Sequence, residues 1–220
     1  MIKRIIIVFI LALAVFNGSI FVYADSDVKV NDTLYDARVK NISNRRYFDA
    51  VKEAIKEAKE SIYMTMYIIQ ASGKGNKRKV DELLDELARA KERGVEVKVI
   101  LDENIDFTNK GRKTLKAEMK SLNAYRFLKE KGIDVYYDES SIYTHAKAIV
   151  IDREIVIAGS TNWTNTSLER SFEVTTFTKS KPLAEEILEE FKDIEIREGV
   201  DEFIEEKDAI SVSMDFLEGP

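Results

Sequence analysis

The chain has 220 residues, enough for one domain with a sizeable core, and its 45% hydrophobic content with only two prolines indicates an ordered globular protein. It contains no cysteine, which excludes disulfide bonds, a thiol nucleophile and thiolate metal sites. The net charge of -6 argues against a nucleic-acid partner, but the charge is unevenly distributed. Residues 183–220 hold 14 acidic and 3 basic residues, so residues 1–182 hold 31 basic and 26 acidic ones. The body of the chain is therefore mildly basic.

The first 24 residues are typical of a signal peptide. Lys3 and Arg4 precede an apolar run over residues 5–16, and Val22-Tyr23-Ala24 resembles a small-x-small cleavage site. An uncleaved membrane anchor is the alternative, because residues 20–23 extend the apolar stretch to near spanning length. Both interpretations predict a secreted or periplasmic location, or a membrane-anchored extracytoplasmic domain.

Helical and strand patterns alternate through the rest of the chain. Apolar residues at helical spacing predict helices over residues 45–60, 78–93, 110–131 and 182–193. Alternating or short apolar runs predict strands over residues 61–69, 95–101, 133–137, 146–151, 155–158 and 172–178. The alternation predicts an α/β fold, a mixed β-sheet flanked by helices on both faces, over residues 45–193. Residues 25–44 are expected to form a linker or a short leading strand, and residues 194–220 an acidic C-terminal appendage.

One segment, residues 144–174, combines groups that suit an anionic phosphoryl ligand. His145 is the only histidine, and it stands two residues from Lys147, so an extended backbone projects both side chains the same way. Imidazole can attack phosphorus or transfer a proton near neutral pH, and lysine supplies a positive charge. A tight turn at residues 152–154 leads into a second strand, whose end delivers small and polar groups at Gly159, Ser160 and Asn162. Each residue alone is common in structural settings, but the combination at this spacing is hard to obtain by chance.

The pattern His145-x-Lys147-x4-Asp152-x6-Gly159-Ser160-x-Asn162 resembles the HKD motif of the phospholipase D superfamily. Glu173 falls where that family has a downstream acid that orients the histidine. The chain carries one copy of the motif and is similar to the small, single-motif, nuclease-type members, which act as homodimers. The resemblance extends from about Arg45 to about Phe191 and implies a phospholipase D-like α/β sandwich with metal-independent phosphodiesterase activity and no cofactor.

The resemblance also implies a role for each motif residue. His145 would attack phosphorus to form a phosphohistidine, while a second His145 across a two-fold dimer interface would act as general acid and then as base. Lys147 and Asn162 would neutralise the non-bridging oxygens, and Glu173 would hold the imidazole tautomer. The supporting positions are Gly159, Ser160, which is expected near the phosphate, and Asp152, which lies off the His145 face and is expected to be structural.

Two basic clusters bear on the substrate. One is a loop with Lys74, Lys77, Arg78 and Lys79; the other includes Lys113, Lys116 and Lys120, which share a helical face. They form either a phosphate-backbone track or ordinary solvated surface. We expect a non-specific secreted endonuclease acting on DNA or RNA. The alternatives are a phospholipase D that hydrolyses phospholipid head groups, suggested by the apolar Ile105 and Phe107, and a non-catalytic polyanion-binding module, against which the intact motif argues. Trp163 is expected in the core.

Overall fold

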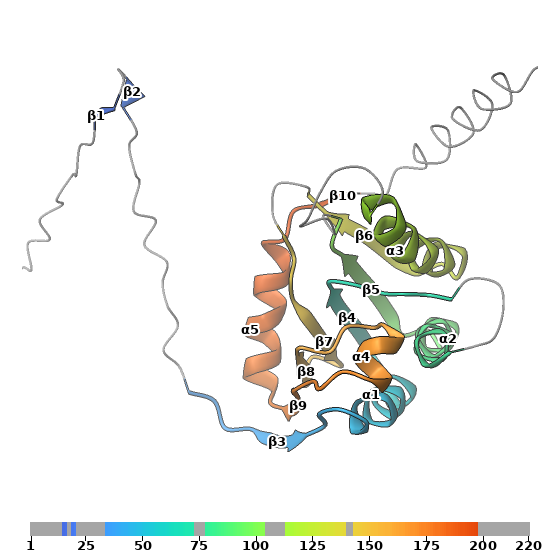
Figure 1. Ribbon diagram of the computed structural model, residues 1–220. Coiled ribbons are helices and arrows are strands. Elements are labelled where there is room, and N and C mark those ends of the chain that lie inside the picture. Colours follow the sequence, from blue (N-terminus) through green and yellow to red (C-terminus); the bar gives the residue numbers. More distant parts are fainter. Residues whose placement is uncertain are drawn as a thin grey trace, which may run out of the picture. The chain divides into compact units, whose positions relative to one another are not determined.

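The computed structural model describes residues 34–72, 78–103, 113–139 and 143–197, without the side chains of residues 113–120, together with two short N-terminal strands. These strands, β1 (Val15–Phe16) and β2 (Ser19–Ile20), pair antiparallel in a separate unit formed by residues 1–34. The remaining elements belong to a second unit, which is shown in Figure 1. They are, in chain order, β3 (Arg38–Asn41), α1 (Arg46–Glu57), β4 (Ser61–Met66), α2 (Lys79–Glu92), β5 (Glu96–Leu101), α3 (Lys113–Glu130), β6 (Asp134–Asp138), β7 (Lys147–Ile151), β8 (Ile155–Gly159), α4 (Asn165–Glu169), β9 (Thr175–Lys179), α5 (Lys181–Lys192) and β10 (Ile196–Arg197).

Eight strands of this unit form one mixed sheet in the order β10-β6-β5-β4-β7-β8-β9-β3. Strands β4, β5 and β6 are parallel, and every other neighbouring pair is antiparallel. The predicted mixed sheet is confirmed, and the motif hairpin β7–β8 occupies its centre as expected. Among the helices of the described residues, none is both long enough and apolar enough to cross a membrane.

Helices cover both faces of the sheet, also as predicted (Figure 1). The larger core packs α1, α2, α3 and α4 against one face, and a smaller core packs α5 against β7 and β8 on the other. Strand β7 serves both cores, because Ile149 and Ile151 point into the larger one and Val150 into the smaller one. This double burial explains why its sequence is a continuous apolar run.

The predicted helices and strands are all present, with ends that differ by up to three residues, as where β4 ends at Met66 and not at Ile69. Three differences have a structural explanation or consequence. Strand β9 begins at Thr175 and not at Phe172, because the Phe172 and Val174 side chains are exposed and the backbone there follows a loop. The short helix α4 was not predicted. The expected acidic appendage begins with β10, which pairs with β6, while residues 198–220 lie outside the described residues.

The turn of the motif hairpin is tied to the loop between α1 and β4. Asp152 and Arg153 both have φ +51°, as a tight turn with a left-handed backbone requires. The Asp152 carboxylate accepts hydrogen bonds from the backbone N–H groups of Lys59, Glu60 and Ser61 at 2.8–3.1 Å. This part of the motif therefore holds two segments of the fold together.

We expect Asp152→Ala to lower the free energy of unfolding by about 1–2 kcal/mol, because it removes the acceptor of these partly solvated N–H groups. Urea denaturation would measure the loss. Asp152→Asn is the matched control, since asparagine tolerates the left-handed backbone and keeps one acceptor oxygen. Equal stability of the alanine variant and the wild type would contradict the tethering role.

Candidate active site

The motif residues gather at one edge of the sheet because β7 runs antiparallel to both of its neighbours. Met66, at the end of β4, pairs with Lys147 at the start of β7. On the other side, β8 ends at Gly159, which pairs with Thr175 at the start of β9. His145 therefore enters β7, Ser160 leaves β8 and Glu173 approaches β9 at the same edge.

The Tyr67 ring is a shared surface for the histidine and the lysine. Its centroid lies 4.3 Å from that of the His145 imidazole and 4.5 Å from the Lys147 Nζ. The backbone N–H of Tyr67 donates to the carbonyl of Ala146 at 3.1 Å, which fixes the ring beside both residues. His145 and Lys147 thus lie on one side of the segment, as their spacing predicted.

Burial tunes the charges of this pair in a direction that suits nucleophilic attack. Partial burial, helped by the nearby Lys147 charge, lowers the pKa of His145, so the imidazole is unprotonated near neutral pH. Burial also lowers the pKa of Lys147 to about 8, although the negative charges of Asp102 and Glu173 oppose this shift. Its ammonium group donates to the His145 carbonyl at 2.5 Å. Near neutral pH the site therefore combines a neutral imidazole with a positive lysine.

Glu173 is held from two directions. Its carboxylate accepts a hydrogen bond from the Ser160 hydroxyl, and its backbone N–H donates to Asn44 Oδ1 at 2.8 Å. The Ser160 hydroxyl in turn accepts the Val174 N–H at 3.1 Å. Within the described residues no hydrogen bond joins Glu173 to His145, so the orienting role of this carboxylate stays a prediction.

Gly159 allows the two strands to approach each other at the site. A Cβ at this position would lie 2.2 Å from the Val174 carbonyl oxygen and 2.4 Å from Thr175 Oγ1, closer than real contacts allow. Any side chain here would push β8 away from β9 and displace Ser160 from Glu173. The glycine of the motif is therefore a requirement of backbone packing.

Asn162 is positioned by the residue that follows it. Trp163 is fully buried, as predicted, donates its Nε1–H to the Tyr47 hydroxyl at 2.9 Å and donates its backbone N–H to the Ile68 carbonyl at 3.1 Å. The Asn162 side chain is partly buried, and its Oδ1 has no hydrogen-bond partner in the described part of the chain. This unpaired oxygen is an acceptor, so a ligand or water that donates a hydrogen bond can satisfy it.

A pocket of about 540 Å³ lies between the start of α2 and α4. Two of its lining residues follow residues of the site in the chain. Gln70 lies three residues after Tyr67, and Asn165 lies three residues after Asn162. The backbone N–H of Gln70 joins these two segments by donating to the Trp163 carbonyl at 2.7 Å. The pocket is polar and is lined by Gln70, Arg78, Lys79, Glu82, Asn165, Thr166, Glu169 and Arg170.

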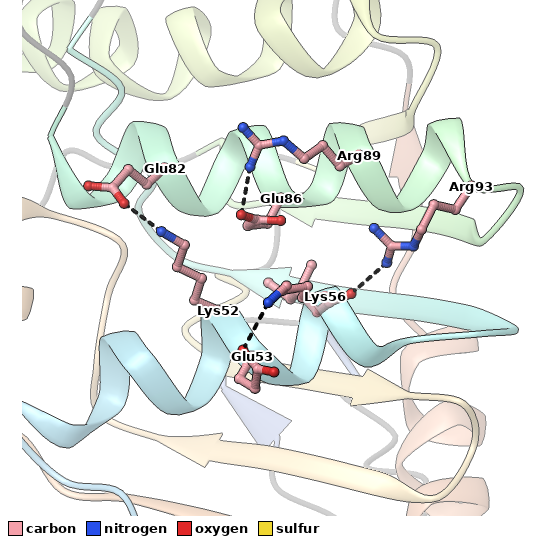
Figure 2. A network of polar contacts seen from close by, with 8 residues as sticks. Lys52, Glu53, Lys56, Glu82, Glu86, Arg89 and Arg93 are labelled. Carbon is pink, nitrogen blue, oxygen red and sulfur yellow. Dashed lines mark hydrogen bonds and ion pairs between the residues drawn. The ribbon is translucent and has the colours of Figure 1, made fainter.

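Only part of the predicted basic clusters can be placed. Arg78 and Lys79 line this pocket, whereas Lys74 and Lys77 and the side chains of Lys113 and Lys116 lie outside the described residues. Figure 2 shows that the Lys52 ammonium pairs with the Glu82 carboxylate, at 2.7 Å. Because Glu82 is already neutralised, the basic residues dominate the pocket's free charge.

Sequence patterns did not identify Tyr67, Asp102, Asp138 or Arg170 as part of this region. Asp102 follows β5 and Asp138 ends β6, so both stand at the carboxyl ends of parallel strands. That position was the available signal, because ligand sites of α/β sheets form at such ends. Within the described residues, no group of three or more acidic or histidine side chains is arranged to hold a metal ion.

Comparison with known proteins places this site in a family. A family model described as "Cardiolipin synthase, PLD-like domain" matches residues 51–194. Phospholipase D from Rickettsia felis is 32% identical over 140 residues, which cover 63% of this chain and 59% of that protein. Human mitochondrial cardiolipin hydrolase is 29% identical over 105 residues, which cover 47% of this chain and 36% of that protein. The similarity thus spans less than two thirds of either relative.

Solved structures agree with this assignment. Nuc from Salmonella typhimurium, a phospholipase D family member, superposes with a TM-score of 0.58 at 26% identity, covering 74% of this chain and all of Nuc. NucT from Helicobacter pylori gives a TM-score of 0.55 at 16% identity, covering 72% of this chain and 96% of NucT, and supports the fold. The chain belongs to the phospholipase D superfamily.

Proposed function

We propose that this protein is a metal-independent endonuclease that cleaves DNA or RNA without sequence specificity. The observation that carries the proposal is the polar pocket between the start of α2 and α4, with Arg78, Lys79 and Arg170 among its lining residues. A polynucleotide bound at His145 has further phosphates on either side of the scissile one. The positive side chains of the pocket would attract these flanking phosphates. A phospholipid head group, by contrast, has no row of phosphates that would extend into the pocket.

In the proposed reaction, the unprotonated His145 imidazole attacks phosphorus and forms an N–P bond while the bond to the leaving oxygen breaks. A general acid gives its proton to the leaving oxygen. Water then attacks the phosphohistidine, the same group takes the proton from water, and the N–P bond breaks. Lys147 and Asn162 stabilise the charge on the non-bridging oxygens. Glu173 and Ser160 support the histidine side of the site.

The second group is proposed to be His145 of a second subunit, since the chain has only one histidine. A two-fold axis beside the motif edge would bring both copies to one phosphate. The surface around the site supports this arrangement, because three large apolar side chains are exposed there: Phe172 at 85%, Val174 at 59% and Tyr143 at 53%. They flank Glu173 and His145 in the sequence, and a partner subunit would bury them.

A phospholipase D acting on phospholipid head groups is the second candidate. The names of the curated relatives, phospholipase D and mitochondrial cardiolipin hydrolase, favour it, and the exposed Phe172 suits a lipid surface as well as a partner subunit. The apolar residues Ile105 and Phe107 lie outside the described residues. The proposed setting, secreted, periplasmic or anchored outside the cytoplasm, is compatible with both substrates and rests on residues 1–24.

The substrate is decided by incubating the protein and its His145→Ala variant in EDTA with plasmid DNA, RNA, phosphatidylcholine and cardiolipin in parallel. We expect the wild type to cleave nucleic acid, and the variant to lose at least about 10³-fold in rate because the nucleophile is gone. Choline release with intact plasmid would assign the protein to the lipid-hydrolysing class. Strict dependence on added Mg²⁺ would contradict the metal-free scheme.

Phe172→Lys tests the dimer. Burying a phenylalanine side chain contributes about 1.5–3 kcal/mol, so we expect dimerisation to weaken by roughly tenfold or more and activity to fall with it. Sedimentation at several protein concentrations measures the first effect, and the rate at the same concentrations measures the second. Ile196→Lys, on the exposed edge strand β10, is the control and should change neither. A fully active monomer would rule out the shared site.

A double variant, Arg78→Ala with Arg170→Ala, tests the pocket. We expect the KM for nucleic acid to rise and its log-log salt dependence to fall by about 1.4–1.8, since each of the two lost phosphate contacts removes about 0.7–0.9. Hydrolysis of bis(4-nitrophenyl) phosphate, which has no phosphate beside the scissile one, should stay unchanged. Arg153→Ala is the matched control, because Arg153 pairs with Glu185 at the other end of the motif hairpin. Equal losses on both substrates would refute a polynucleotide subsite.

A further inference from the structure

Two carboxyl groups are buried behind the motif edge. Asp102 is 0% exposed and Asp138 is 1% exposed, and they follow or end the adjacent parallel strands β5 and β6. Leu101 pairs with Tyr137 in the parallel ladder, so the two aspartates leave neighbouring strands at the same level, and the charge of Asp138 acts on Asp102. Buried carboxylates this close cannot both be ionised without strong repulsion.

The hydrogen bonds of the pair are unequal. Asp138 is well supplied with donors, because its Oδ1 accepts the Glu103 N–H at 2.8 Å and its Oδ2 accepts the Thr144 N–H at 2.9 Å. Asp102 is poorly supplied: among the described residues, neither of its carboxylate oxygens has a hydrogen bond of ordinary geometry, although the Thr144 N–H is near enough to lower its pKa. A proton held between the two groups resolves this, since a protonated carboxyl can donate to an ionised one.

Each member of the pair also reaches a motif residue. Asp138 holds the N–H of Thr144, the buried residue that immediately precedes His145. Asp102 interacts electrostatically with Lys147, whose ammonium lies between the Tyr67 ring and the His145 carbonyl. Asp138 thus holds the backbone that leads into His145, and Asp102 acts on the charge of Lys147.

We propose that Asp102 and Asp138 share one proton and form a positioning pair, in which Asp138 fixes the backbone leading into His145 and Asp102 supplies the buried counter-charge for Lys147. When the pair releases its shared proton to solvent, the extra negative charge lies beside Lys147 and holds its ammonium form. When the pair is protonated, that support is weaker. The role deepens the proposed function, because it sets the pH range over which the site keeps its cation.

The charged groups around Asp102 are consistent with this role. Asp138 faces it from β6, Lys147 from β7 and Tyr67 from the end of β4. Glu103, next in the chain, is paired with Arg197 of β10. Burial and the neighbouring Asp138 charge raise the pKa of Asp102 from 3.8 to about 7, and burial raises that of Asp138 too.

The test replaces the shared proton with an amide. Asp102→Asn can donate to Asp138 permanently, so it mimics the protonated pair while filling the same space. The readout is the pH at which Lys147 becomes reactive toward an acylating reagent, followed by peptide mass spectrometry on the full-length protein. We expect the midpoint to fall by about one pH unit, because a neighbouring negative charge has been removed. Asp134→Asn, at the exposed opposite end of β6, is the control and should keep the wild-type midpoint.

A second test measures how the stability of the folded protein changes with pH. Because the folded state raises the pKa of Asp102 above its unfolded value, it retains a proton that the unfolded chain releases, and this stabilisation is present below about pH 4 and lost as the pH rises through about 7. The urea midpoint of the wild type should therefore decline relative to that of Asp102→Asn between about pH 4 and about pH 7.5. Parallel curves would show that no proton is shared.

The labelling and activity measurements distinguish a failure of the proposed pair from a failure of the proposed function. An unshifted Lys147 midpoint in Asp102→Asn overturns the pairing with Lys147, whatever the enzyme cleaves. A shifted midpoint in a protein without nuclease activity upholds the pair and overturns the proposed function. With activity present, the alkaline limb of the kcat/KM profile should move to lower pH by the same amount as the labelling midpoint.

Discussion

The antiparallel placement of β7 between β4 and β8 is the constraint on which the rest of the site depends. Strands β4, β5 and β6 run parallel, so their carboxyl ends share one edge of the sheet, and β7 begins at that edge because it runs the other way. The start of β7 brings His145 and Lys147 to the ends that carry Tyr67, Asp102 and Asp138. A parallel β7 would place the same residues at the opposite edge, away from these groups.

Partial burial and a few neighbouring charges together set the protonation states of His145 and Lys147. The charge of Lys147 acts on His145, and this charge is disfavoured by burial and favoured by Asp102 and Glu173. Its positive charge in turn helps to keep the imidazole neutral. The protonation of His145 is therefore coupled to that of Lys147. A change in the charge of Asp102 or Glu173 alters the pKa of Lys147 and, through it, the pKa of His145.

Local periodicity was sufficient to predict most of the fold. The continuous apolar run of β7 predicted burial on both faces, and the glycines after α2 and α3, with φ +89° and +69°, marked helix ends. Local periodicity failed at Phe172 and Val174, whose alternating pattern resembles a strand although both side chains are exposed. It also gave no sign of the Asp102 and Asp138 pair. A single aspartate after an apolar run looks like any turn residue, and the pair exists only because β5 and β6 are neighbours in the folded sheet.

The segment before α1 has a consequence for proteolytic trimming. Strand β3 pairs with β9, Ser43 accepts the Thr175 N–H, and Asn44 accepts the N–H of Glu173 itself. A protease that cuts before Tyr35 would leave these bonds intact, whereas a cut after Asn44 would remove the support of Glu173 without touching any motif residue. Recombinant fragments that start at the first helix would carry the same defect, and the shortest fragment that preserves the site starts upstream of β3.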